Sequence, residues 1–189
     1  MNRARRKRLF VAIPLEARVR EACARCAERL REAGVSARWV TPANYHVTVA
    51  FLGPVEAERV SELSAALRAT VAKVAPFALP LDRVGGFPST RRARVIWCGC
   101  GQPNVAFAQL CRDVQAALEP FDLHFEPHLD PHVTLARSTG TVLPQQTAAP
   151  ARDAHAQSLV LFESFTQRDG ARYVALESFP FGRRRAQPA

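Results

Sequence analysis

The chain lacks any hydrophobic run long enough for a membrane-spanning helix or the core of a signal peptide. Its basic start is followed only by the short apolar stretch 9–13 before Pro14 and Glu16 interrupt it. The five cysteines are an odd number without the spacing of a disulfide framework, which is typical of a reducing compartment. We therefore expect a cytoplasmic protein that makes no membrane contact.

Two widespread catalytic signatures are missing as well. The chain contains no Gly-x-Ser-x-Gly nucleophile elbow and no Gly-x-x-x-x-Gly-Lys-Ser/Thr phosphate-binding loop, so nothing in it supports ATP-dependent chemistry. Cys23 and Cys26 have the spacing of half a zinc site, but no second pair with that spacing follows. We therefore expect neither a cofactor nor a metal.

One group of histidines keeps metal binding open as an alternative. His124, His128 and His132 recur every four residues, a spacing that would place them on one face of a helix. Pro127 and Pro131 lie within this stretch and disfavour a helix there. In an extended chain the three imidazoles could still share one face, so a metal site stays an alternative reading.

The excess of positive charge is concentrated at the two ends of the chain. The formal net charge is +9, from 26 Lys and Arg against 17 Asp and Glu. Residues 1–8 and 183–189 hold eight of the basic side chains, and the other 18 nearly balance the 17 acids. We expect residues 1–8 and 182–189 to be basic tails, which either attract a polyanion modestly or are simply solvated.

The length of 189 residues, 48% of them hydrophobic, suits one domain, which we expect to span residues 9–181. Its order of elements predicts an α+β fold with two similar lobes facing each other across a cleft. Hydrophobic periodicity and Gly/Pro positions predict strands at 9–13, 38–40, 46–52, 77–81, 93–98 and 132–136, helices at 16–33, 56–74 and 104–118, a loop at 85–88, and a closing hairpin of strands 158–164 and 173–179.

The most informative feature is a short motif that occurs twice, as His46-Val47-Thr48-Val49 and as His132-Val133-Thr134-Leu135. Side chains two apart on a strand point to the same face, so each motif presents an imidazole beside a hydroxyl. Two such strands brought together would pair an acid and a base with two hydrogen-bond donors, a set suited to splitting a phosphodiester without a metal. Alternatively, these are ordinary strands in which threonine serves only its β propensity.

The two motifs and their flanks resemble the two-histidine (2H) phosphoesterase superfamily. More narrowly, they resemble its bacterial and archaeal RNA 2′,3′-cyclic phosphodiesterases, historically called 2′-5′ RNA ligases. The likeness runs from Leu9 to about Phe181 and includes the stretches 9–13, 38–40, 44–53, 85–88, 94–97, 131–137 and 159–164. It implies a bilobal fold in which antiparallel-rich sheets line a central cleft and the helices lie outside.

The resemblance also implies an activity, the metal-independent hydrolysis of 2′,3′-cyclic phosphate ends of RNA or nucleotides to 2′-phosphomonoesters. By this analogy His132 accepts a proton from water and His46 donates one to the departing 3′ oxygen. Thr48 and Thr134 would donate hydrogen bonds to the phosphoryl oxygens. Arg137 is a further candidate for substrate binding, but on a regular strand it faces away from Thr134, so it is either a phosphate ligand beyond a bend or a solvated arginine.

Two other functions remain open: reversible 2′-5′ ligation by the same site, and a non-catalytic RNA-binding module. The chain departs from its relatives at Ala50, where a basic residue is common, and at Asp130, near which a second histidine is common. Tyr45, Phe51 and Trp39 could stack on a nucleobase but suit a core equally well. We expect an RNA or nucleotide substrate, no obligate protein partner, and a monomer.

Overall fold

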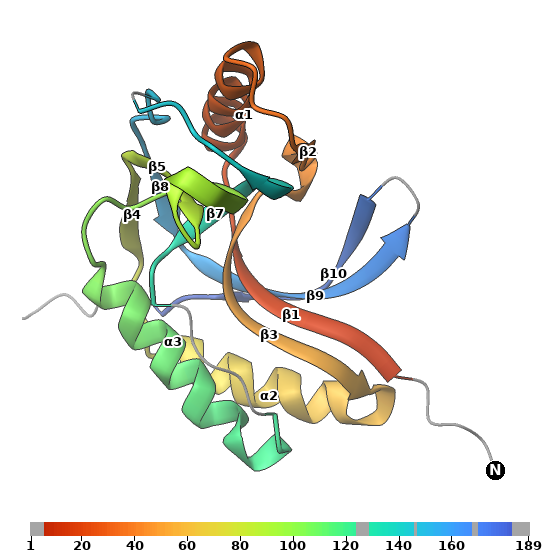
Figure 1. The fold of residues 1–189 in the computed structure, drawn as a ribbon. Helices are drawn as coiled ribbons and strands as arrows, with labels where there is room; N and C mark the ends of the chain where they lie inside the picture. Colours follow the sequence, from red (N-terminus) through yellow and green to blue (C-terminus); the bar gives the residue numbers. More distant parts are fainter. Residues whose placement is uncertain (1–5, 124–128, 146, 168–169, 183–189) are drawn as a thin grey trace, which may run out of the picture.

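The computed structural model describes residues 6–123, 129–145, 147–167 and 170–182. Within these ranges three α-helices and four short 3-10 helices are interspersed among ten strands, and the last four strands follow one another (Figure 1). The elements are β1 (Arg6–Pro14), α1 (Ala17–Glu32), β2 (Arg38–Trp39), η1 (Pro42–Asn44), β3 (His46–Glu56), η2 (Ala57–Arg59), α2 (Val60–Val71), β4 (Phe77–Leu81), β5 (Arg83–Phe87), η3 (Thr90–Arg92), β6 (Ala93–Gly99), α3 (Val105–Leu118), η4 (Glu119–Phe121), β7 (His132–Thr141), β8 (Arg152–Ala156), β9 (Ser158–Gln167) and β10 (Gly170–Pro180).

The main sheet joins two sets of antiparallel strands. Its order is β10-β9-β1-β3-β7-β6-β5, and β2 also pairs with β7. The two sets meet where β3 pairs with β7, at Val47 opposite Val133. Strands β4 and β8 form a separate two-stranded sheet. The expected α+β fold with two lobes is confirmed, and each lobe carries one copy of the repeated motif on the strand at the junction.

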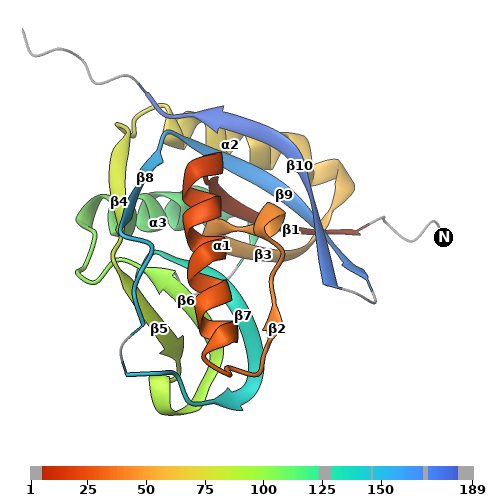
Figure 2. The same ribbon diagram turned by 90° about the horizontal axis from the view of Figure 1, so that it is seen from above.

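Helices α1 and α3 each cover strands of the half opposite to the strand that they follow. Helix α1 follows β1 in the chain but contacts β7 and β8, whereas α3 follows β6 but contacts β3 and lies beside α2 (Figures 1 and 2). The Sγ atom of Cys23 on α1 lies 3.4 Å from that of Cys98 on β6, and both cysteines are free. This exchange of helices ties the two lobes together behind the sheet.

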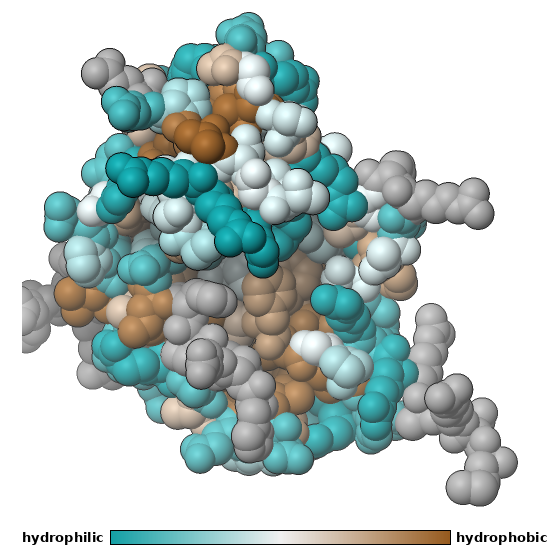
Figure 3. Space-filling view, in the orientation of Figure 1, coloured by the Kyte–Doolittle hydropathy of each residue, from teal (hydrophilic) through white to brown (hydrophobic). Residues whose placement is uncertain are grey.

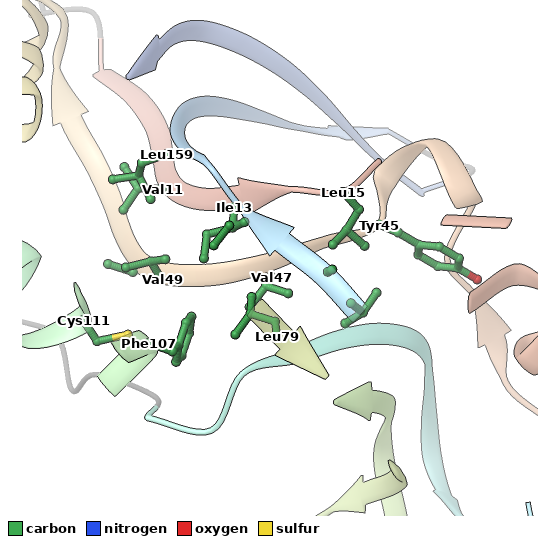
Figure 4. Close-up of a cluster of buried hydrophobic side chains, with 14 of the residues drawn as sticks. Val11, Ile13, Leu15, Tyr45, Val47, Val49, Leu79, Phe107, Cys111 and Leu159 are labelled. Atoms are coloured by element: carbon green, nitrogen blue, oxygen red, sulfur yellow. The ribbon is translucent and has the colours of Figure 1, made fainter. Parts of the chain in front are cut away.

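The hydrophobic core lies between the sheet and these helices. The middle residues of the motifs, Val47 and Val133, are fully buried in it, and Figure 4 shows Val47 and Val49 on the same side as Phe107 of α3. Burying one such side chain contributes about 1.5–3 kcal/mol. Because alternate residues of a strand point to opposite faces, this core turns the histidines and threonines of both motifs to the other face of the sheet.

Most of the surface seen in the orientation of Figure 1 is hydrophilic. Figure 3 shows hydrophobic residues grouped towards the middle of that face, where β1 and β3 run, with hydrophilic residues around them. In the part of the chain that the structure describes, no helix combines the length and the apolar character needed to cross a membrane.

Several predicted boundaries agree with the structure and several differ. Helix α1 ends before Gly34, whose φ of +83° closes the helix as predicted. Strand β3 continues to Glu56 instead of ending at Gly53, because Gly53 adopts a φ of +70° at a register shift against β1 and pairing then resumes. Gly85 lies inside β5, not in a loop, because it packs directly against the indole of Trp97, where a Cβ atom would lie only 2.2 Å from the ring.

The chain ends also differ from the prediction. Strand β1 begins at Arg6, so residues 6–8, which we expected in a basic tail, belong to the sheet. Lys7 Nζ lies 2.5 Å from Glu163 Oε2 on β9, and Arg6 pairs with Glu56 on β3. Gly182, the first residue of the predicted C-terminal tail, donates its N–H to Val71 O at 3.2 Å. Residues 1–5 and 183–189 of the predicted tails lie outside the described residues.

Candidate active site

The two motif histidines begin the two strands at the centre of the sheet, His46 on β3 and His132 on β7. The antiparallel register with Val47 opposite Val133 places Thr134 next to His46 and Thr48 next to His132. The two histidines are then diagonal neighbours, with Cα atoms about 7–8 Å apart. Residues remote along the chain therefore form one constellation of two imidazoles and two hydroxyls.

A backbone carbonyl two residues upstream orients each imidazole. His46 Nδ1 lies 2.7 Å from the Asn44 oxygen, and His132 Nδ1 lies 2.9 Å from the Asp130 oxygen. Since a carbonyl only accepts, each Nδ1 carries the hydrogen and donates it, which leaves Nε2 as the reactive nitrogen. His46 Nε2 accepts a hydrogen bond from the Thr48 hydroxyl at 3.0 Å. Asp130 thus orients His132 with its main chain.

Aromatic rings from distant strands hold the two imidazoles in place. The His46 ring contacts Phe10 of β1 and Tyr173 of β10, with centroids 5.0 Å and 5.3 Å away. The His132 ring contacts Phe87 of β5 and Trp97 of β6, at 5.1 Å and 6.1 Å. No local pattern in the sequence indicated these contacts, because they arise only from strand pairing.

The surroundings of His46 disfavour its charged form. Burial lowers the pKa of His46 from 6.5 to about 4; the hydrogen bond to Asn44 opposes this shift and the charge of His132 adds to it. In the free protein at neutral pH His46 is therefore a neutral imidazole. The effect of His132 also shows that the two histidines interact electrostatically.

Both motif strands carry a β-bulge directly after the motif threonine. On β7, Trp97 pairs with Thr134 and Ile96 with Ala136, so Leu135 is an extra residue. On β3, Ala12 pairs with Thr48 and Val11 with Ala50, so Val49 is the corresponding extra residue. A bulge shifts the alternation of side chains by one position. The residues three places after the threonines therefore turn to the histidine face.

The bulge on β7 decides the orientation of Arg137. The sequence left open which face of the sheet the Arg137 side chain points to. The bulge turns this exposed side chain to the same face as Thr134. Arg38 of the two-residue strand β2 pairs with Arg137 and lies beside it, although it had not been singled out as a site residue. Of the aromatic residues considered for stacking, Tyr45 is buried in the core and Phe51 is 54% exposed.

Only one of the three histidines considered as metal ligands, His132, belongs to the described residues. His124 and His128 lie outside the described residues. Within the described ranges, no group of three or more His, Cys, Asp or Glu side chains could hold a metal ion.

Sequence comparison places these features among known proteins. A family model described as "LigT like Phosphoesterase" matches residues 13–97. The RNA 2′,3′-cyclic phosphodiesterase of Escherichia coli (strain K12) is 38% identical over 136 residues, which cover 69% of this chain and 72% of that protein. The protein of the same name from Methanothermobacter thermautotrophicus is 30% identical over 135 residues, which cover 70% of this chain and 72% of that protein. The Geobacillus stearothermophilus protein is 33% identical over 147 residues, but only 46% of its length is matched.

Solved structures share the whole fold. E. coli LigT complexed with phosphate has a TM-score of 0.77 and 28% identity, over 94% of this chain and 99% of that one. Its complex with 3′-AMP has a TM-score of 0.78 and 27% identity, over 95% and 100%. The bilobal fold and the paired motif thus define a LigT-like phosphoesterase. The chain belongs to the family of the RNA 2′,3′-cyclic phosphodiesterases, as the motifs had predicted.

Proposed function

We propose that this protein hydrolyses the 2′,3′-cyclic phosphate end of an RNA or nucleotide to a 2′-phosphomonoester, without a metal. The observation that carries the proposal is the pair of imidazoles, each held in the Nδ1–H tautomer by a carbonyl, on one sheet face with a threonine beside each. The names of its relatives and the phosphate and 3′-AMP complexes of E. coli LigT indicate the same class of substrate.

The proposed reaction uses each histidine through Nε2. His132 accepts a proton from water, and the water oxygen attacks phosphorus on the side of His132. The bond from phosphorus to the 3′ oxygen breaks while that oxygen takes a proton from His46; the bond to the 2′ oxygen stays intact. His132 ends protonated and His46 neutral; His132 then loses its proton to solvent, and His46 gains a proton when the next substrate binds.

This division of roles requires His46 to gain a proton when the substrate binds. With a pKa of about 4, it is neutral in the free protein at neutral pH. The negative charge of a bound phosphate favours the imidazolium and raises the pKa. The contact with Asn44 suits both states, because Nδ1–H donates in each. Substrate binding is therefore coupled to proton uptake.

Thr48, Thr134 and Arg137 complete the proposed site. On substrate binding the Thr48 hydroxyl would turn from His46 Nε2 to a phosphoryl oxygen, and Thr134 would donate to another. Arg137 would contact the substrate beyond the bulge of β7. All of these residues come from one chain, and we propose that the protein acts as a cytoplasmic monomer.

The proposal is tested by hydrolysis of adenosine 2′,3′-cyclic phosphate in EDTA. We expect wild-type turnover to persist and the His46→Ala and His132→Ala variants to lose about 10²–10⁴-fold in kcat, the usual contribution of a general acid or base. His155→Ala is the matched control, since His155 lies on β8 and its Nδ1 contacts Glu16, outside the site. Circular dichroism verifies that each variant is folded.

Other results would select a different function. Turnover abolished by EDTA and restored by a metal would refute the proposed mechanism. Joining of a 5′-hydroxyl oligonucleotide to the cyclic end, lost in both histidine variants, would identify ligation at the same site. Tight RNA binding with no turnover of any diester would identify a binding module.

A further inference from the structure

A side-chain hydrogen bond joins the segment before His46 to strand β10. The Nδ2 atom of Asn44 donates to the Ala171 oxygen at 2.7 Å, although the two residues lie 127 positions apart in the chain. Asn44 is the last residue of η1, and Ala171 is the second residue of β10. Strand β10 is the last in the sheet order, and an edge strand has carbonyls without a neighbouring strand to bind. The Asn44 amide therefore attaches η1 to the edge of the sheet.

The main chain of the same asparagine holds the imidazole of His46. The Asn44 oxygen accepts the Nδ1–H of His46 at 2.7 Å. Asn44 thus makes two contacts, one from its side chain to β10 and one from its carbonyl to His46. The next residue, Tyr45, is only 4% exposed, so burial fixes the chain directly after Asn44. The side-chain contact with β10 restrains the carbonyl from the other direction.

The local structure of η1 restrains this carbonyl only weakly. The element has three residues, and its backbone hydrogen bonds run from Asn44 N to Thr41 O at 2.8 Å and from Tyr45 N to Pro42 O at 3.2 Å. A single turn of 3-10 helix has poorer hydrogen-bond geometry than an α-helix. Residues 41–43 are also exposed. The orientation of the Asn44 carbonyl therefore depends on the long-range contact of the Asn44 side chain.

Strand β10 also contacts the His46 ring directly. Tyr173 follows Ala171 by two residues, so the two side chains lie on the same face of β10. The Tyr173 ring is edge-on to the His46 ring, with centroids 5.3 Å apart, and its centroid lies 4.8 Å from that of Phe10. Asn44, Ala171 and Tyr173 line the same cavity, of about 300 Å³. Strand β10 therefore meets His46 both through Tyr173 and through Asn44.

We propose that Asn44 is a positioning residue for the acid of the reaction: its side chain, anchored on β10, holds its carbonyl against His46 Nδ1. The hydrogen bond that a neutral imidazole makes decides which of its nitrogens carries the hydrogen. A displaced carbonyl would allow the hydrogen to move to Nε2, where His46 could then no longer take up a proton. This inference deepens the proposed function and rests on it for the role of His46 as the acid.

Removing the amide of Asn44 tests the proposal through kcat. Asn44→Ala and Asn44→Leu both lack the donor to Ala171, and the leucine variant keeps a side chain of similar size. We expect both to lower kcat for adenosine 2′,3′-cyclic phosphate by about tenfold to a hundredfold, as for a reacting group misplaced by about 1 Å, with KM within about threefold of wild type.

The matched control is Asn104→Ala. The Asn104 amide also donates to a strand carbonyl, that of Ala78 at 3.0 Å, and the Asn104 side chain caps α3. Its removal should lower the stability of the protein but keep the wild-type kcat. Wild-type kcat in folded Asn44→Ala and Asn44→Leu would overturn the proposal.

The tautomer of His46 is a measurement that a general loss of stability would not change. Proton–nitrogen NMR of the imidazole nitrogens distinguishes Nδ1–H from Nε2–H. At neutral pH we expect the hydrogen on Nδ1 in wild type and Asn104→Ala, and a mixture of both tautomers in Asn44→Ala and Asn44→Leu. His132 is the internal control, because its Nδ1 contacts the Asp130 oxygen and its tautomer should stay the same in all variants.

The NMR measurement needs no substrate, so it separates this inference from the proposed function. If no cyclic phosphate is hydrolysed but the tautomer of His46 changes in the Asn44 variants alone, the proposed function fails and the anchoring of His46 stands. If hydrolysis depends on both histidines while the Asn44 variants keep the tautomer and kcat of wild type, this inference fails alone. In a protein that hydrolyses the substrate, a change in either property without the other would also overturn it.

Discussion

Each motif histidine in this protein is oriented by a main-chain carbonyl. His46 and His132 donate Nδ1–H to Asn44 and Asp130 in equivalent geometry. A carbonyl fixes the tautomer without bringing a full negative charge, so burial decides the pKa of His46. The charge that makes His46 an acid must then come from the substrate, which suits an enzyme whose substrate is an anion.

The low pKa of His46 predicts a pH-dependent stability. The folded protein has a His46 pKa of about 4 and the unfolded chain about 6.5, so the unfolded state binds the proton more readily. The stabilisation is fully present above pH 6.5 and is lost as the pH falls through 4, by about 3 kcal/mol in all. Urea unfolding between pH 7 and pH 4.5 should show a smaller loss for His46→Gln than for wild type.

The matched control for this measurement is His155→Gln. His155 lies near the carboxylate of Glu16 and is not a buried neutral imidazole. Replacing His155 should therefore not reduce the loss of stability at low pH in the way that replacing His46 does. If wild type and His46→Gln lose equal stability over this pH range, His46 is not the group responsible.

At the scale of elements, the site depends on how the strands around it are paired. The bulges at Val49 and Leu135 turn the following side chains to the histidine face. Strand β6 positions the start of β7, since Gly99 pairs with His132. A Cβ atom at position 99 would lie 2.4 Å from the Pro131 oxygen and 3.1 Å from the Cβ atom of His132. A glycine there allows the close approach of the two strands.

Replacing Gly99 by alanine should therefore move His132. We expect Gly99→Ala to lower kcat by about tenfold to a hundredfold, the effect of misplacing a reacting group by about 1 Å, and stability by about 1–3 kcal/mol. Hydrolysis assays and urea unfolding measure the two effects. Val114→Ala, a buried position on α3, serves as the control for stability alone and should keep kcat. Wild-type kcat in folded Gly99→Ala would contradict the prediction.

At the scale of the whole molecule, two groups of arginines account for the excess of positive charge. Arg8, Arg38, Arg137 and Arg172 line two neighbouring cavities, and five further arginines occur at positions 3, 5 and 183–185. The remaining charges of the chain are nearly balanced. Positive charge attracts a nucleic-acid backbone through counterion release, so the terminal arginines would strengthen the binding of an RNA.

Removal of residues 1–5 and 183–189 should separate these contributions. We expect affinity for a single-stranded RNA to fall by less than about tenfold and its salt dependence to become shallower. Hydrolysis of adenosine 2′,3′-cyclic phosphate should keep its wild-type rate, because a substrate with a single phosphate gains little from counterion release. RNA affinity and salt dependence identical to wild type would show that the terminal arginines are merely solvated.

The sequence alone determined what each motif strand presents. The alternation of a strand puts His46 beside Thr48 and His132 beside Thr134, whatever the rest of the chain does, and Gly34 ends α1 for an equally local reason. Only the tertiary structure decided that the two histidines meet, that Arg137 faces them, and that Arg38 and the aromatic rings lie beside them. These features depend on register and bulges between strands far apart in the chain, and no local pattern encodes the partner of a strand.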